Sequence, residues 1–163
     1  MLSHLGWLAW PLAFAVQYGV LYRCESQWSQ RIRNLSHCLS LWLLLLVITS
    51  EISWRVDEMP ELAETWSLAL WGLVPMVLLS LLGSQGHRCS WPVARHAALY
   101  QGVASDVPVL ALLGWGLASL ANSAEPSPLP YIPLLNPLEL IELAILLLAA
   151  LRWQRGQMVW PVK

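Results

Sequence analysis

The sequence predicts an all-α fold, a polytopic transmembrane helix bundle of about five spans with a proline-rich extended segment on the outer surface. Hydrophobic residues make up 57% of the 163 residues and charged residues only 12%, whereas soluble domains contain roughly 45–50% and about 25%. Eleven tryptophans accompany a single phenylalanine, and tryptophan is enriched where a membrane meets water. Five hydrophobic runs follow one another with little charge between them. Together these observations indicate an integral membrane protein.

Each hydrophobic run is about as long as a bilayer-crossing helix, which needs about 20 residues and at least about 17. One such run could be a buried helix of a soluble protein, but five in succession with so little charge argue against that class. We therefore expect a single transmembrane region over residues 1–163, with spans at about 5–22, 38–54, 66–82, 103–121 and 138–153.

The first span does not begin like a signal peptide. No Lys or Arg precedes it, and no small-residue cleavage site follows it. Such a start is typical of an internal helix of a longer protein. We therefore expect the chain to be a fragment or a shortened relative of a larger membrane protein.

The three middle spans differ in the strength of their signal. The second, centred on Leu41–Val47, is the clearest, and Pro75 is expected to kink the third. The fourth is the weakest, because it contains Asp106 and two glycines. Gly114 and Ala118 within it present small residues on one helix face, which predicts close approach of a neighbouring helix.

The fifth span follows a proline-rich stretch. Prolines remove backbone donors and push the preceding residues toward extended geometry, so residues 125–136 are predicted to be extended on the outer surface. Asn136 and Pro137 are typical of the cap and first position of a helix. Glu139 then lies in the first turn, where the helix dipole favours a carboxylate. The outer motif consists of Pro130, Tyr131, Pro133, Asn136 and Pro137.

The distribution of basic residues predicts the orientation of the spans. Segments 22–36 and 83–102 and the C-terminal tail hold eight Lys and Arg residues, whereas the opposite side has only Arg55. Short loops rich in Lys and Arg stay cytoplasmic. We therefore expect a bacterial inner-membrane protein with its N-terminus outside and its C-terminus in the cytoplasm. All three cysteines fall on the cytoplasmic side, where thiols stay reduced.

Carboxylates inside the spans are the candidate functional residues. Glu142 shares a helix face with Glu139 and lies deeper, where an ionised side chain costs roughly 2.5–3.5 kcal/mol on insertion scales and should face protein or water. Glu51 and Arg55 lie at the same predicted depth, so these four residues form a candidate polar cluster. An interfacial Glu142 and a local Glu51–Arg55 ion pair remain alternatives. Asp106 is a candidate helix-end carboxylate on the cytoplasmic side.

No motif in the sequence predicts a cofactor or a metal. His37 and Cys38 are adjacent, and Arg88 separates His87 from Cys89, so neither pair has the spacing of zinc ligands. Walker, G-x-S-x-G and H-E-x-x-H motifs are not found. With a net charge of −1, nothing favours nucleic acid as a partner. We therefore assign no metal, no cofactor and no catalytic residue.

Two stretches resemble a known family. Leu5–Ala13, LGWLAWPLA, and Leu129–Leu140, LPYIPLLNPLEL, are similar to the C-terminal half of domain-of-unknown-function family 2339, and Trp91–His96 lies between them at a similar spacing. The resemblance covers most of the chain and implies a large multi-pass bacterial inner-membrane protein. It also implies that further helices of the parent, together with the lipid bilayer, are the partners of this region. It brings no catalytic residues.

Three functions from different classes remain. The preferred one is a packing or scaffold portion of a larger envelope protein, which needs helices, boundary tryptophans and a stiff outer connector. The alternative is part of a transporter whose path is lined by Glu51, Glu139 and Glu142. A membrane enzyme acting on lipid-linked or envelope substrates is the second alternative, although enzymatic activity is not favoured.

Overall fold

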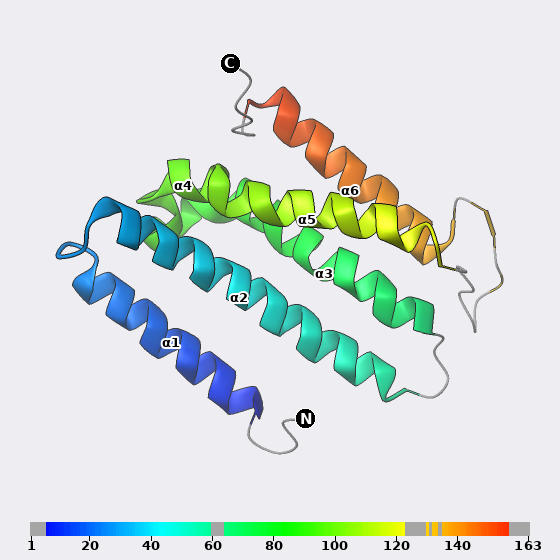
Figure 1. The fold of residues 1–163 in the computed structure, drawn as a ribbon, viewed down its shortest axis with the longest axis horizontal. Coiled ribbons are helices and arrows are strands. Elements are labelled where there is room, and N and C mark those ends of the chain that lie inside the picture. The colour runs from blue at the N-terminus through cyan, green and yellow to red at the C-terminus, as the bar shows by residue number, and fades with distance from the viewer. Residues whose placement is uncertain (1–5, 60–63, 123–129, 131, 134, 157–163) are drawn as a thin grey trace.

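The computed structural model describes residues 6–59, 64–122, 130, 132–133 and 135–156. Every regular element within these residues is helical, which confirms the all-α class. Five long helices correspond in order to the five hydrophobic runs (Figure 1): α1 (Gly6–Cys24), α2 (Gln30–Asp57), α3 (Glu64–Gln85), α5 (Val103–Ser119) and α6 (Pro137–Gln154). Three short elements join α3 to α5: η1 (Gly86–Arg88), η2 (Ser90–Ala94) and α4 (Ala97–Gln101).

Three helical segments are long and apolar enough to cross a membrane. Within the described residues these are Gln30–Asp57, Glu64–Arg88 and Ala97–Ser119. The remaining two helices are shorter, with 19 residues in α1 and 18 in α6. The length and hydropathy of three helical segments therefore support membrane insertion.

α2 begins well before its apolar run. Ser29 caps it, with its Oγ accepting a hydrogen bond from the backbone N–H of Ile32 at 3.5 Å. Arg31 and Arg33, which the sequence analysis placed in a connector, therefore lie in the first turn of the helix. Hydropathy marks the apolar part of a helix, whereas the cap decides where the helix starts.

The start of α6 agrees with the prediction made from Asn136 and Pro137. Asn136 is buried, and its Oδ1 accepts a hydrogen bond from the backbone N–H of Leu138 at 3.0 Å. Pro137 occupies the first helical position, where a missing N–H costs nothing. Most of the stretch predicted to be extended, including Tyr131, lies outside the described residues.

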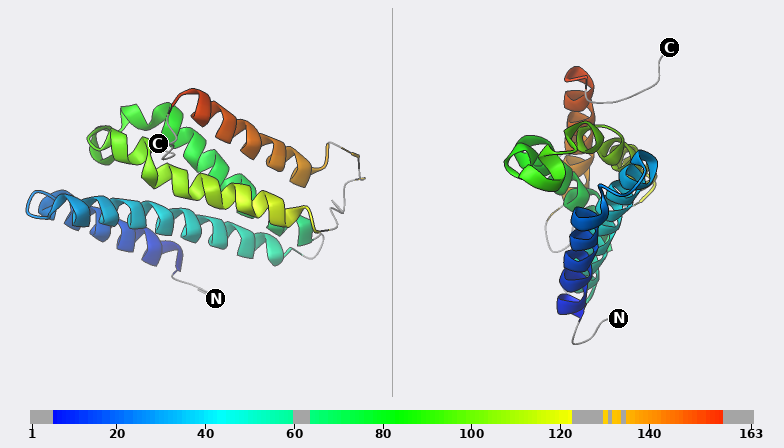
Figure 2. Two further views of the ribbon diagram at one scale, coloured as in Figure 1. Left: turned by 45° about the horizontal axis from the view of Figure 1, so that its top comes forward. Right: turned by 90° about the vertical axis from the view of Figure 1, so that its left-hand side faces the viewer.

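The helices form a bundle in which α3 has a central place. α1 and α2 lie side by side as an antiparallel pair, and α3 packs against α2 on one side and α6 on the other (Figures 1 and 2). α5 lies against α2, α3 and α6. The apolar core forms where these helices meet. Its buried residues include Leu41, Leu45, Ala69, Leu79, Val109, Leu112, Leu138, Ile141 and Ile145.

One end of the bundle gathers the three segments in which the sequence analysis counted basic residues. The α1–α2 connector, the segment from η1 to α4 and the C-terminal end of α6 meet there (toward the left in Figure 1). We call residues 24–30, 86–102 and 152–156 the connector end. The C-terminal ends of α2 and α5 and the N-terminal ends of α3 and α6 lie at the opposite end.

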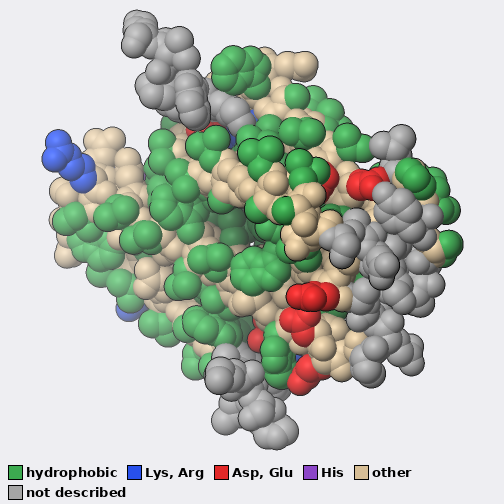
Figure 3. Space-filling model, turned by 45° about the vertical axis from the view of Figure 1, so that its right-hand side comes forward, with side chains coloured by type: hydrophobic (Ala, Val, Ile, Leu, Met, Phe, Trp, Pro, Cys, Tyr) green, Lys and Arg blue, Asp and Glu red, His purple; other side chains and the backbone are tan. Residues whose placement is uncertain are grey.

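The outward faces of the long helices remain apolar. Leu12, Leu117 and Leu120 are each about two-thirds exposed or more, at 66%, 73% and 69%, and hydrophobic side chains cover most of the face in Figure 3. Soluble monomers rarely expose apolar patches larger than a few hundred Å². This surface therefore suits lipid or further helices.

Gly72 on α3 marks a close contact between helices in the core. A Cβ built there would lie 2.5 Å from the Trp115 ring on α5 and 2.8 Å from Ile141 Cγ2 on α6. Gly114, which the sequence analysis placed at a close contact, has no atom of the described residues within 4 Å of such a Cβ. The close approach thus occurs at a glycine that the small-residue spacing did not indicate.

Candidate functional site

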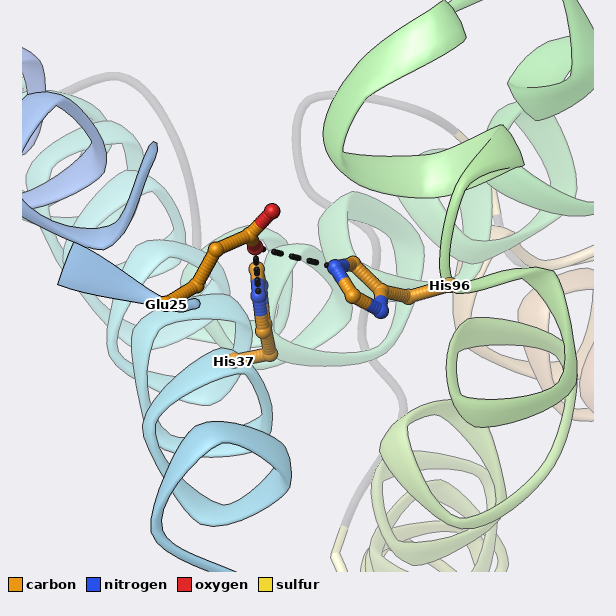
Figure 4. A group of neighbouring side chains, drawn as sticks. All are labelled: Glu25, His37 and His96. Carbon is orange, nitrogen blue, oxygen red and sulfur yellow. Dashed lines mark hydrogen bonds and ion pairs between the residues drawn. The ribbon is translucent and has the colours of Figure 1, made fainter. Parts of the chain in front are cut away.

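The densest group of buried polar side chains lies at the connector end, around Glu25. This residue follows α1 and is only 3% exposed. Its Oε2 lies 3.0 Å from His96 Nε2, 3.4 Å from His37 Nε2 and 3.2 Å from Trp91 Nε1, which donates to it. Figure 4 shows the carboxylate between the two imidazole rings. Three segments that are distant in sequence therefore converge on one oxygen.

Each histidine has a defined place in this group. His37, in the second turn of α2, is fully buried, and its Nδ1 lies 3.0 Å from the Tyr100 hydroxyl. His96 precedes α4 and keeps 14% of its side chain exposed. The two ring centroids are 4.6 Å apart.

The other carboxylate oxygen of Glu25 faces Arg95. Arg95 Nη1 lies 3.3 Å from Oε1, and the arginine side chain is mostly exposed. Within the described residues, Oε1 is buried and accepts no hydrogen bond. Burial raises the pKa of the Glu25 carboxyl, but hydrogen bonds from His96, Trp91 and His37 outweigh burial, so its pKa lies below the ordinary value. The carboxylate is therefore ionised at neutral pH.

The sequence pattern does not predict this group. Only His37 and His87 have a cysteine one or two positions away, and Glu25 belongs to no motif. The partners are 12, 66 and 71 residues apart, so no local spacing indicates them. The one available signal was that both predicted cytoplasmic connectors carry residues able to bind metals or protons.

A second buried polar contact at the connector end joins α6 to α5. Arg152 is 4% exposed, and its Nη2 donates to Asp106 Oδ1 at 2.8 Å and to the carbonyl oxygen of Gln101 at 2.6 Å. The predicted helix-end carboxylate Asp106 does lie in the first turn of α5. Its ion-pair partner, 46 residues away, was not predicted.

Two contacts of the structure involve residues of the predicted outer cluster. Arg55 pairs with Glu51 at 3.1 Å on the surface of α2, which matches the local alternative. Glu142 on α6 accepts a hydrogen bond from Ser119 Oγ of α5 at 2.6 Å. No described hydrogen bond or ion pair joins Glu51 or Arg55 to Glu142, and Glu139 lies in the first turn of α6. The single cluster remains a prediction.

One apolar cavity lies apart from these charges. It has a volume of about 280 Å³ between α2, α3 and α5, and Trp42, Trp71 and Trp115 line it together with Pro75 and Pro108. Its lining offers almost no polar group, so it cannot hold a charged reactant.

Comparison with known proteins identifies the family. The family described as "Predicted membrane protein (DUF2339)" matches residues 1–161. The chain belongs to the DUF2339 family. This match covers nearly the whole chain and confirms the resemblance seen in the sequence. No curated protein and no solved structure matches.

Membership of the DUF2339 family agrees with the structure on membrane character, since three helices are long and apolar enough to span a bilayer. The family description names no reaction, ligand or partner. In this DUF2339 chain, possible roles of the buried groups at the connector end therefore follow from their geometry.

Proposed function

We propose that this DUF2339 chain is a helix-packing scaffold within a larger envelope protein of the bacterial inner membrane, crossing the bilayer five times. One observation carries the proposal: buried charged side chains connect separate helices at the connector end, while the outward helix faces remain apolar. Glu25 links the α1–α2 connector to the segment before α4, and Arg152 links α6 to α5.

These contacts suit a scaffold because they fix the relative positions of helix ends. Apolar packing between transmembrane helices is weakly directional, since lipid tails are as apolar as leucine. A buried ion pair, or a buried carboxylate that accepts several hydrogen bonds, favours one arrangement of its partners. The apolar outward faces then offer a surface to the further helices of the parent protein.

The proposed orientation places the connector end in the cytoplasm and the N-terminus outside. The basic residues of the connector end support it, since short loops rich in Lys and Arg stay cytoplasmic. We expect a single cysteine at Gln27→Cys, in a chain without its native cysteines, to react with a membrane-impermeant maleimide only after spheroplasts are permeabilised. Glu58→Cys should react in intact spheroplasts. Labelling of both sites from the same side would contradict the orientation.

The transporter alternative is tested at Glu142. In the scaffold, Glu142 accepts a hydrogen bond from Ser119 and holds α6 against α5, so Glu142→Gln should leave proton permeability unchanged. We expect vesicles containing the wild-type chain or this variant to leak protons no faster than empty vesicles, as followed with an enclosed pH-sensitive dye. Glu58→Gln, at the exposed C-cap of α2 and outside the proposed path, is the matched control. A proton flux present in wild type and lost in Glu142→Gln would refute the scaffold proposal and favour transport.

A further inference from the structure

We propose that Glu25, His37 and His96 bind one divalent transition-metal ion of the zinc type, with the Nε2 atoms of both histidines and a carboxylate oxygen as ligands. The inference does not rest on the scaffold function. It begins from the position of the ligand atoms: one atom from each residue lies within 4.8 Å of the other two. Figure 4 shows that the three side chains point toward a common centre.

The distances fit a small ion. Nitrogen and oxygen ligands lie about 2.1 Å from Zn²⁺, so two ligands of a tetrahedral site are about 3.4 Å apart. Glu25 Oε2 lies 3.4 Å from His37 Nε2 and 3.0 Å from His96 Nε2. Two of the three ligand pairs therefore already have nearly the spacing of a tetrahedral site, and the third lies within 4.8 Å.

The ligand types select the class of metal. Two imidazoles and one carboxylate suit zinc, iron and neighbouring divalent ions, whereas Mg²⁺ and Ca²⁺ prefer sites made of oxygen ligands alone. Three protein ligands are one fewer than a closed structural zinc site provides. The proposed site therefore leaves a coordination position for water.

The surroundings orient the ligands as a metal site requires. A histidine that binds metal through Nε2 donates its Nδ1–H to a fixed partner, and Tyr100 Oη lies 3.0 Å from His37 Nδ1. Trp91 Nε1 donates to Glu25 and would stay hydrogen-bonded to the carboxylate after an ion entered. The two rings lie 4.6 Å apart, so both imidazoles reach the same carboxylate.

Two further observations favour a ligand at this position. The buried Glu25 Oε1 accepts no hydrogen bond within the described residues, so the carboxylate retains acceptor capacity. Access also exists, because His96 is partly exposed and the Arg95 side chain beside it is mostly exposed. An ion could therefore enter from the connector end without crossing the apolar core.

The test measures Zn²⁺ binding by the full chain, purified in detergent with a tag that contains no histidine and then stripped with EDTA. Equilibrium dialysis with metal analysis should give one Zn²⁺ per wild-type chain, and excess Mg²⁺ should not displace it. Glu25→Gln, His37→Gln and His96→Gln should each weaken binding by about 100-fold or more, and Tyr100→Phe by about 10-fold. His87→Gln, an exposed histidine of the same segment, should bind as wild type does.

Wild-type protein that retains no Zn²⁺ after stripping and reloading would overturn the proposal, as would unchanged binding in a folded His96→Gln variant. Circular dichroism identifies variants that do not fold. The Co²⁺ spectrum of the wild-type chain then decides independently of any variant. Bands of nitrogen and oxygen ligation support the site, and a thiolate charge-transfer band would assign the metal to cysteine instead.

Discussion

Arg152→Met is expected to destabilise the folded chain by about 3–5 kcal/mol, the cost of removing one partner from a buried ion pair. Arg152 is 4% exposed, and its Nη2 donates to both Asp106 and the carbonyl oxygen of Gln101. Methionine preserves the length and apolar stem of the side chain but leaves the Asp106 carboxylate without its cation. Unfolding by sodium dodecyl sulfate in mixed micelles, followed by tryptophan fluorescence, measures the loss.

Arg155→Met is the matched control, since Arg155 lies three residues further along, is exposed and carries the same charge. It should change stability by less than about 0.5 kcal/mol. The double variant Arg152→Met with Asp106→Asn should regain part of the lost stability, because no unpaired charge remains buried. Equal effects of Arg152→Met and Arg155→Met would show that this ion pair does not hold α6 in place.

Gly72→Ala is expected to destabilise the bundle by about 1–3 kcal/mol, the usual cost of inserting extra atoms into a packed core. The added Cβ would lie 2.5 Å from the Trp115 ring and 2.8 Å from Ile141 Cγ2. Those atoms belong to side chains of α5 and α6, so relief of the clash requires the Trp115 ring and Ile141 to shift or their helices to move away from α3. The same detergent unfolding measurement applies, and tryptophan emission should also report the displacement of Trp115.

The same substitution on α5, Gly114→Ala, provides the control. Nothing in the described residues lies within 4 Å of its added Cβ, and alanine is favoured over glycine inside a helix by up to about 1 kcal/mol. Gly114→Ala should therefore be neutral or stabilising. A Gly72→Ala variant as stable as Gly114→Ala would refute the close contact between α3, α5 and α6.

The long helices could be predicted from the sequence because hydropathy is a local property. Each of the five runs is a helix in the structure, and the Asn136–Pro137 signal gave the first residue of α6 correctly. The start of α2 at Gln30 was missed, since the polar first turns of that helix carry no apolar signal. The Ser29 cap was the local feature that could have indicated it.

The candidate sites could be predicted only in part, because contacts between helices depend on how each helix is rotated. The residues themselves were informative where the partner is local, as in the Glu51–Arg55 pair. The partners of Asp106 and Glu142 lie on other helices. The residue pattern along one helix does not indicate which residue of another helix it contacts. Helix rotation also explains why a close contact with neighbouring helices lies at Gly72 and not at Gly114.

The partners of Glu25 are synthesised at different times. His37 follows Glu25 by 12 residues, but His96 follows it by 71, which a ribosome adding about 5–20 residues per second takes roughly 4–14 seconds to make. The α1–α2 hairpin thus leaves the ribosome with a carboxylate whose remaining donors do not yet exist. Glu25 lies in the connector between α1 and α2, outside both helices. Water can therefore solvate the Glu25 carboxylate until His96 has been made, and the nascent hairpin does not carry this charge into the lipid.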